Sequence, residues 1–274
     1  MELTTNLRKM RTSLDIKNQA QYILPQFDIL ENTGSYFMNP LVGSDITLQY
    51  QNEIHCVVTG KKIKQAFGEG MSYNAWMTSP QASPSIVRPE LSRIHEGIAL
   101  RDKAWEEEHH MQPHYVYLSR TSDIKVGVTR TINVPSRWID QGATEAIVIA
   151  ETPYRQLAGL IEVELKNYLP DKTAWQAMLK NEQKGNSNMV DKKNEMLAII
   201  GGEYEHFIFD DDKITSIHYP VLQDLKKVKS LKLDNTPDFR GKLLGIKGQY
   251  LIFEDGHVFN VRSHAGYRVK ISAE

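Results

Sequence analysis

The sequence predicts an α+β protein, and three observations lead to that class. Aromatic and β-branched residues alternate in residues 115–119 and 125–129, as they do in half-buried strands. A Thr-Pro pair at 152–153 opens an apolar-periodic stretch, because Thr caps a helix well and Pro suits its first position. Asp255-Gly256 between two apolar runs predicts a tight hairpin. Antiparallel strands and helices therefore occur together.

Composition limits the class of protein further. The chain has 274 residues, of which 41% are hydrophobic and 24% charged, which suits two or three small domains. No stretch approaches the roughly 20 apolar residues that span a bilayer, and the polar N-terminus lacks a signal-peptide core. The single Cys56 excludes an internal disulfide framework. We expect a cytoplasmic protein with no membrane partner. Its oligomeric state stays open, and a net charge of -1 provides no global attraction to nucleic acid.

The N-terminal region is predicted to extend over residues 1–112. Residues 46–50 and 54–58 form two short strands joined across residues 51–52. Residues 59–90 are rich in Ser, Thr, Gly and Pro, which predicts irregular chain. A helix is expected at 96–111 because Pro113 ends it.

The central region, residues 113–180, has the most regular pattern. Ser122 and Asp123 separate two alternating runs and predict a hairpin turn. Pro135 can open a short helix, and Gly142 can close it. The predicted elements are strands at 115–119, 125–129 and 146–150, and helices at 135–142 and 152–168, the second stopped by Pro170.

The C-terminal part begins after a polar stretch. Residues 181–195 contain only two apolar residues, which predicts a linker or exposed loop. Residues 196–274 are predicted to form a β-rich module, with a strand at 207–209 and a small β-barrel or curled sheet at the end.

The order strand, strand, helix, strand, helix in the centre resembles a GIY-YIG nuclease core. The residues that carry the likeness are YVYL at 115–118, KVGVTR at 125–130, SRW at 136–138 and LIEVEL at 160–165. The resemblance implies catalytic roles for Tyr117, Arg137 and Glu162, with Gly127 as the glycine of the second motif. It also implies a small antiparallel sheet flanked by helices. The second motif departs from the pattern at its first position, because Lys125 replaces the tyrosine.

Nearly the whole chain is similar to an uncharacterised bacterial family with a domain of unknown function. The stretches that carry this similarity include GKKIKQAFGEG at 60–70, HYVYL at 114–118, RWIDQGA at 137–143 and GIKGQYLIFEDG at 245–256. That resemblance implies a ribbon of two CxxC pairs within about residues 46–92. The ligand positions are Cys56 and Thr59 in the first pair, and Ser72 and Ala75 in the second.

Zinc is not expected at these four positions. A tetrahedral zinc site needs four good donors, usually thiolates, and hydroxyls and a methyl group cannot replace them. Further positions where the family implies cysteines are Ser85, Ser92 and His110. We expect packing to hold the loop instead, with Met71, Tyr73 and Trp76 filling the volume of the metal.

The central residues suit phosphate chemistry. The planar fork of Arg137 can bind a phosphate, with Lys125 and Arg130 as further contacts. A carboxylate such as Glu162 can hold Mg²⁺, which needs only one or two such ligands, and Mg²⁺ is the one cofactor implied. Tyr117 with an ordinary pKa of about 10 is a poor base unless a cation such as Lys125 lowers that value.

Each residue has an ordinary structural alternative. Tyr117 fits a strand aromatic, Arg137 fits a partner of Asp140, and Glu162 fits an i,i+4 pair with Lys166. A helical projection places Glu164 in the apolar stripe and Glu162 on the polar side, so Glu162 is expected to face a wet cleft, with Glu164 as the reserve. Histidines 109, 110 and 114 are interpreted as solvated or capping residues rather than as a metal site.

Three functions remain open from the sequence. The first is a nucleic-acid-processing enzyme, in which cleavage is a divalent-metal-dependent endonuclease reaction. The second is a DNA- or RNA-binding protein without catalysis, which Lys125 favours because losing a general base costs about 10²- to 10⁴-fold in rate. The third is a non-catalytic structural or protein-interaction protein that retains the scaffold.

Overall fold

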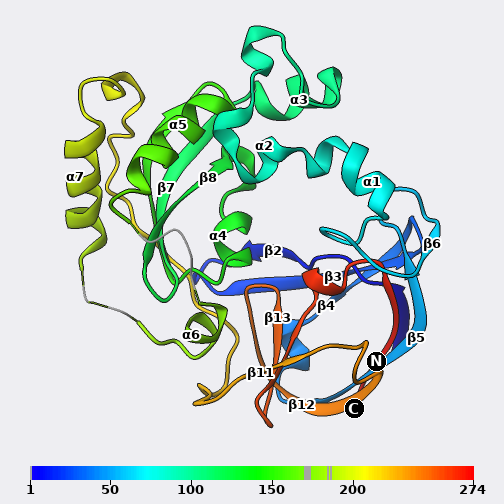
Figure 1. Ribbon diagram of the computed structural model, residues 1–274. Coiled ribbons are helices and arrows are strands. Elements are labelled where there is room, and N and C mark those ends of the chain that lie inside the picture. Colours follow the sequence, from blue (N-terminus) through cyan, green and yellow to red (C-terminus); the bar gives the residue numbers. More distant parts are fainter. Residues whose placement is uncertain (1, 170–173, 184, 186) are drawn as a thin grey trace. The chain divides into compact units, whose positions relative to one another are not determined.

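A computed structural model describes residues 2–169, 174–183, 185 and 187–274 (Figure 1). The predicted α+β class is confirmed, because the described part of the chain contains three β-sheets and seven α-helices. Within that part, no helix is both long and apolar enough to cross a membrane.

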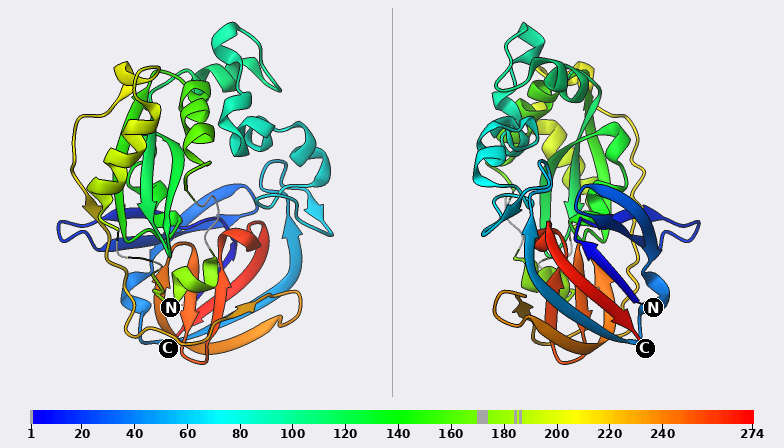
Figure 2. Two further views of the ribbon diagram at one scale, coloured as in Figure 1. Left: turned by 60° about the vertical axis from the view of Figure 1, so that its left-hand side comes forward. Right: turned by 90° about the vertical axis from the view of Figure 1, so that its right-hand side faces the viewer.

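The first and last strands pair with each other. Strand β1 (Glu2–Asn6) is antiparallel to β15 (Tyr267–Ala273), and the two lie side by side in both views of Figure 2. Leu3 is opposite Ile271 in this ladder, and both side chains are buried. The N-terminal residues therefore belong to the same sheet as the C-terminal strands.

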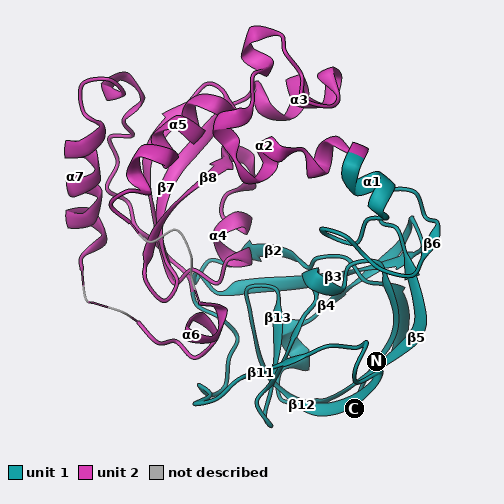
Figure 3. Cartoon of the chain, viewed as in Figure 1, with its two compact units in different colours: residues 1–77, 218–274 teal, residues 78–217 magenta. Residues whose placement is uncertain are grey.

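The chain forms two compact units (Figure 3). Unit 1 is Met1–Met77 with His218–Glu274, and unit 2 is Thr78–Ile217. These boundaries differ from the predicted regions 1–112, 113–180 and 196–274. The reason is long-range pairing, because β1 and β5 (Asp45–His55) hydrogen-bond to strands from the far end of the sequence.

Unit 1 is built mainly on one large sheet. Its strand order is β1-β15-β5-β12-β13-β14-β11, with β6 on β5, and the sheet does not close into a barrel within the described residues. A second sheet has the order β2-β3-β4. The remaining strands of unit 1 are β2 Arg11–Leu14, β3 Ala20–Asp28, β4 Glu31–Phe37, β6 Lys62–Ile63, β11 Lys229–Leu231, β12 Asp238–Lys247, β13 Tyr250–Phe253 and β14 His257–Asn260.

Two hairpins predicted in unit 1 have different outcomes. The turn at Asp255-Gly256 is confirmed, since β13 and β14 flank it and Gly256 has a φ of 87°. The predicted hairpin at residues 46–58 is wrong, because β5 runs through residues 51–52 as one strand. Asn52 adopts a φ of 56° within it, a left-handed conformation that Asn tolerates. Pairing with β12 and β15 on either side holds the long strand together.

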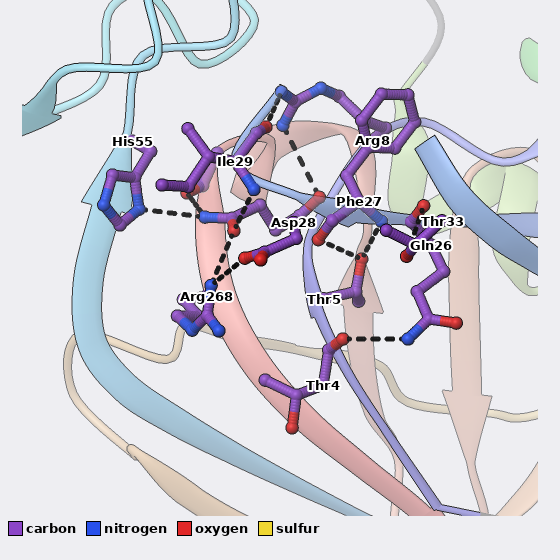
Figure 4. Close-up of polar contacts among 12 residues, drawn as sticks. Thr4, Thr5, Arg8, Gln26, Phe27, Asp28, Ile29, Thr33, His55 and Arg268 are labelled. Atoms are coloured by element: carbon purple, nitrogen blue, oxygen red, sulfur yellow. Dashed lines mark hydrogen bonds and ion pairs between the residues drawn. The ribbon is translucent and has the colours of Figure 1, made fainter. Parts of the chain in front are cut away.

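The side chain of Asn6 joins separate parts of unit 1, and three of the residues that it contacts, Ile29, His55 and Arg268, are labelled in Figure 4. Its Nδ2 lies 3.0 Å from His55 Nδ1 and donates to the Gly266 carbonyl at 3.2 Å. Its Oδ1 accepts from the Ile29 N–H at 2.9 Å and from the Arg268 guanidinium at 3.2 Å. This buried amide therefore uses all of its hydrogen-bonding capacity.

Unit 2 contains a four-stranded antiparallel sheet in the order β10-β9-β7-β8. One face is covered by helices whose apolar residues join a common core, among them Ile161, Leu165 and Met196. The elements of unit 2 are α2 Pro84–Val87, the 3-10 helix η3 Pro89–Leu91, α3 Lys103–His110, β7 His114–Arg120, β8 Ile124–Arg130, α4 Ser136–Asp140, β9 Glu145–Thr152, α5 Arg155–Leu165, α6 Trp175–Leu179, α7 Met189–Ile200 and β10 Thr215–Ser216. Helix α1, Tyr73–Thr78, ends at the junction of the two units.

Several predicted bounds in unit 2 change. The helix expected at 96–111 begins only at Lys103, where Asp102 caps it by accepting from the Trp105 N–H. The supposed linker 181–195 contains the start of α7, because the Asn188 side chain caps that helix. The strand expected at 207–209 is a 3-10 turn followed by one bridge from Ile208. Pro170, expected to stop α5, lies outside the described residues.

Candidate functional site

The β7–β8 hairpin places the predicted site residues on one face of the sheet. Tyr117 is opposite Gly127, and Ser119 is opposite Lys125. Residues two apart in a strand share a face, so Tyr117 and Lys125 lie on the same side. A Cβ at Gly127 would be 2.7 Å from the Tyr117 hydroxyl. The glycine therefore leaves the space in which the phenol ring crosses the neighbouring strand.

The Tyr117 hydroxyl is held by two side chains of the α4 segment. It donates to Gln141 Oε1 at 3.2 Å and is also hydrogen-bonded to Arg137. The ring is fully buried, and it meets Trp138 edge-on at 5.9 Å between centroids. Burial raises the pKa of Tyr117, although contacts with Arg137 and Gln141 oppose that rise. The expected lowering by a cation is therefore outweighed by desolvation, and Tyr117 is poorly suited to act as a base.

Lys125 and Arg137 bring unpaired positive charge to this face. Both are half-buried, and burial together with the charge of Arg137 lowers the pKa of Lys125 to about 8. Among the residues that the structure describes, neither side chain takes part in an ion pair. Arg130 is half-buried at the end of β8, where burial lowers its pKa and Glu108 opposes that change. Cations held without carboxylate partners form an environment that favours an anion.

Glu162 lies close enough to Tyr117 for its charge to affect the pKa of the phenol. Glu162 as a whole residue is 8% exposed, and Lys166 Nζ lies 3.2 Å from its Oε2, as an i,i+4 pair. No hydrogen bond of good geometry reaches that oxygen from the described residues. Burial raises the pKa of Glu162, although Lys166 and Arg155 oppose the rise. The structure thus brings Tyr117, Arg137 and Glu162 into one region, with direct contact only between the first two.

The prediction that Glu162 faces a wet cleft is wrong. The helical projection considered α5 alone, whereas η3 covers the Glu162 side of that helix at Gly159. Leu160, which the projection placed in the apolar stripe, is 40% exposed. Glu164 is half-buried, and its charge acts on Tyr204 rather than on the site. Of the two acids, it is Glu162 that lies near Tyr117, and it does so as a buried residue rather than a solvent-facing one.

Arg155 is a member of this region that sequence reasoning missed. Its guanidinium donates to the carbonyls of Ser85 and Ile86 at 2.8 and 2.9 Å. Burial lowers the pKa of Arg155 to about 10, Glu162 opposes this change, and Arg137 contributes to it. The sequence did contain a signal for Arg155, which is its spacing of seven residues from Glu162. Residues seven apart lie two turns along the same face of a helix. Gln141 was missed likewise, although it follows Arg137 by four residues.

Two histidines near Arg155 are buried, which corrects their interpretation as solvated or capping residues. His110 is 1% exposed and His114 is 0% exposed, and Nε2 of each has no hydrogen-bond partner among the described residues. Burial, with Arg155 as a further cause, lowers the pKa of His110 to about 3, and burial lowers that of His114 to about 4. His110 Nδ1 lies 3.1 Å from Ser92 Oγ, so two of the positions where cysteines were implied are in contact.

The four predicted ribbon positions also lie close together, in unit 1. Cys56 Sγ accepts from the Ser72 N–H at 3.1 Å, and the Ser72 hydroxyl accepts from the Ala75 N–H at 3.2 Å. Burial acts to raise the pKa of Cys56, but hydrogen bonds from Thr59, Ser72 and Val58 outweigh it and lower the value to about 7. In the described part of the chain, no three His, Cys, Asp or Glu residues are placed to hold a metal ion.

Mg²⁺ fits the residues around Glu162 poorly. Mg²⁺ prefers hydrated carboxylate oxygens in an open octahedral arrangement. Here the acid is nearly buried, its Oε2 faces the Lys166 ammonium, and Arg155 acts on it as well. Glu90 contributes a second negative charge, but its carboxylate is bound by Arg88 at 2.9 Å. The positive charges of Lys166 and Arg155, rather than a divalent ion, therefore balance the carboxylate of Glu162.

Glu162→Gln is expected to raise the melting temperature at pH 7. Burial raises the folded-state pKa of Glu162, so the folded chain holds this proton more tightly than the unfolded chain. The resulting loss of folding stability is absent below the pKa of Glu162 in the unfolded chain, about 4.3, and grows as pH rises through the pKa of Glu162 in the folded chain. Thermal melts of both proteins at pH 3 and pH 7 measure it, and the gain should vanish at pH 3. A loss of stability at pH 7 would instead show that the pair with Lys166 is net favourable.

Comparison with known proteins gives one match. A family model described as "Protein of unknown function (DUF2797)" matches residues 43–269. No curated protein matches the chain. No solved structure matches it either. The match includes all predicted site residues and most of both units.

Proposed function

Because the chain belongs to the DUF2797 family, whose description names no activity, we propose a function from its own residues: unit 2 binds the phosphates of nucleic acid. A GIY-YIG-like scaffold is part of this proposal, and it is supported by three antiparallel strands and two helices that follow the order strand, strand, helix, strand, helix. One observation carries the proposal. Lys125 of β8 and Arg137 of α4, which is hydrogen-bonded to Tyr117 on the same sheet face, are half-buried without carboxylate partners among the described residues.

The geometry of Arg137 supports phosphate binding rather than a structural ion pair. Its side chain is anchored by the buried Tyr117 hydroxyl, which limits the freedom lost when a ligand binds. The planar guanidinium retains further donors for phosphate oxygens. The positive charge of Lys125 lies close enough for each cation to affect the other, and a shared anion would relieve that repulsion.

Binding without efficient cleavage is the form of this function that the site supports best. A nuclease of this type needs a base and a metal-ready acid. Burial raises the pKa of Tyr117 and leaves it no access to solvent, while Glu162 faces cations. Lys125 also occupies the position of the second motif tyrosine. These features favour phosphate contact over proton transfer.

Arg137→Gln and Lys125→Gln are each expected to weaken oligonucleotide binding about tenfold, as loss of a charge-assisted contact does. Each should also reduce the slope of log affinity against log salt by about one, equally for different sequences. Fluorescence anisotropy with labelled DNA and RNA measures both quantities. Lys213→Gln, at an exposed lysine of the same unit, is the matched control and should bind as the wild type does. Unchanged affinity in both site variants would reject the proposal.

A cleavage assay separates binding from catalysis. Wild type and Glu162→Ala are incubated with supercoiled DNA and with RNA in Mg²⁺. We expect equal, background-level nicking from both proteins. Mg²⁺-dependent nicking by the wild type alone would show that the site is an active nuclease and would overturn the non-catalytic form. Absence of any salt-dependent binding would leave the protein-interaction function.

A further inference from the structure

The sequence predicted that Tyr73 and Trp76 fill the interior of the ribbon segment, and this prediction is wrong. Met71 is 4% exposed and Ala75 is 5% exposed, so these two side chains occupy the inside of the loop. Tyr73 is 58% exposed and Trp76 is 38% exposed. Both rings lie on the outer side of α1, where they cannot replace a metal in stabilising the fold. Their position points to a different use.

The rings form a continuous surface with Phe67, here named the aromatic patch (Phe67, Tyr73 and Trp76). Phe67 and Trp76 are stacked, with centroids 6.0 Å apart and planes at 25°. Tyr73 meets Phe67 edge-on at 5.3 Å and lies 6.2 Å from Trp76. Gly68 makes this close approach possible, because a Cβ there would be 3.0 Å from the Trp76 ring. Phe67 is half-buried, and the two exposed rings packed on it form an apolar surface of the kind found at interaction sites.

The unpaired charges close to the aromatic patch in sequence are positive. Lys64 lies three residues and Lys61 six residues before Phe67, on either side of β6; both are exposed and form no ion pair with the described residues. The acids of this segment are already bound, since Glu69 pairs with Arg262 and Glu53 pairs with Lys62. In the segment that leads to the patch, the unpaired charge is therefore that of two lysines, which is complementary to a polyanion.

We propose that the aromatic patch is a stacking platform for unpaired bases of single-stranded nucleic acid. Exposed rings with adjacent lysines are the combination that binds single strands without sequence preference, because every base has a stacking face and every phosphate a charge. A protein partner would use the rings but would gain nothing general from two unpaired lysines. The inference goes beyond the proposed function, since this surface belongs to unit 1 and needs none of the unit 2 residues.

The test compares two ligands that differ only in their bases. Full-length protein is titrated against a labelled single-stranded oligonucleotide and against an abasic strand of equal length, with anisotropy as the readout. Trp76→Ala and Tyr73→Ala are each expected to weaken binding of the base-containing strand about tenfold, as loss of one stacked base does. Binding of the abasic strand should not change. Trp76→Phe keeps a ring and should restore most of the affinity.

Phe37→Ala is the matched control, because Phe37 is a 50% exposed aromatic residue in β4 of the same unit. It should bind both strands as the wild type does. Equal losses on the two strands, unchanged affinity in both patch variants, or no binding of single strands by the wild type would each overturn the proposal. The outcome is separable from that for unit 2, since Arg137→Gln should weaken binding of both strands by removing a phosphate contact.

Discussion

Gly159→Ala is expected to destabilise unit 2 by about 2 kcal/mol, although alanine is the better helix former. A Cβ at this position would be 2.2 Å from the backbone nitrogen of Glu90 and 2.6 Å from the carbonyl carbon of Pro89. Both atoms belong to backbone, so α5 and η3 must move apart. Overpacking of this kind costs about 1–3 kcal/mol or more, against at most about 1 kcal/mol gained in helix propensity. The separation would also uncover Glu162, which lies on the same side of α5.

Urea denaturation measures the change as a shift of the midpoint at constant slope. Val163→Ala in the same helix is the matched control, because Val163 is 42% exposed and gains helix propensity without a clash. It should change stability by less than about 0.5 kcal/mol. A Gly159→Ala protein as stable as this control would mean that η3 does not rest on α5 in solution.

Asn6→Ala is expected to lower the stability of the protein by about 3 kcal/mol. The variant removes two donors and one shared acceptor from a buried position, and it strands the Ile29 N–H, while the Gly266 carbonyl keeps its bond from the His55 N–H at 2.8 Å. Each buried polar group left without a partner costs about 1–3 kcal/mol. His55 and Arg268 lose their contact with the amide as well. The β3–β4 turn would then be less firmly held to the large sheet.

Thermal and chemical denaturation measure this loss, and amide hydrogen exchange at Ile29 locates it. Gln51→Ala serves as the comparison, since the Gln51 amide is exposed and bonds to the Gln49 carbonyl at 3.1 Å. That change should be near neutral. If Asn6→Ala were equally harmless, water would have to replace the lost bonds, and the amide could not be a junction of the fold.

Local patterns predicted the elements of unit 2 well where the sequence signal was short-range. The β7–β8 hairpin and the strand at 146–150 form, because alternation and turn residues act between near neighbours. A helix also follows Thr152, but the predicted cap is wrong: Thr152 ends β9, and α5 begins at Arg155 after Tyr154 without a side-chain cap. The unit boundaries differed for the opposite reason. Strand β5 pairs with β12 and β15, which lie about two hundred residues further along the chain, and no local pattern encodes such a partner.

The candidate site shows the same division. The resemblance selected Tyr117, Arg137 and Glu162, and the structure places them in one region. The sequence did not indicate that Tyr117 is fully buried. Alternation shows that a strand has two different faces, but it does not show which face a helix or loop will cover. Arg155 and Gln141 were missed, and His114 was wrongly interpreted as solvated or capping, since each becomes relevant only through contacts between different elements.

The sequence by itself determined the α+β class, the central hairpin with Gly127 beside Tyr117, and the absence of thiolates at three of the four ribbon positions. Those features depend on residue identity and short spacing. Only the tertiary structure decided which strands share a sheet, that η3 covers Glu162, and that Tyr73 and Trp76 lie outside rather than inside the ribbon. All the elements that meet at a residue determine how deeply its side chain is buried. Burial in turn determines which side chains keep an ordinary pKa and which can reach a ligand.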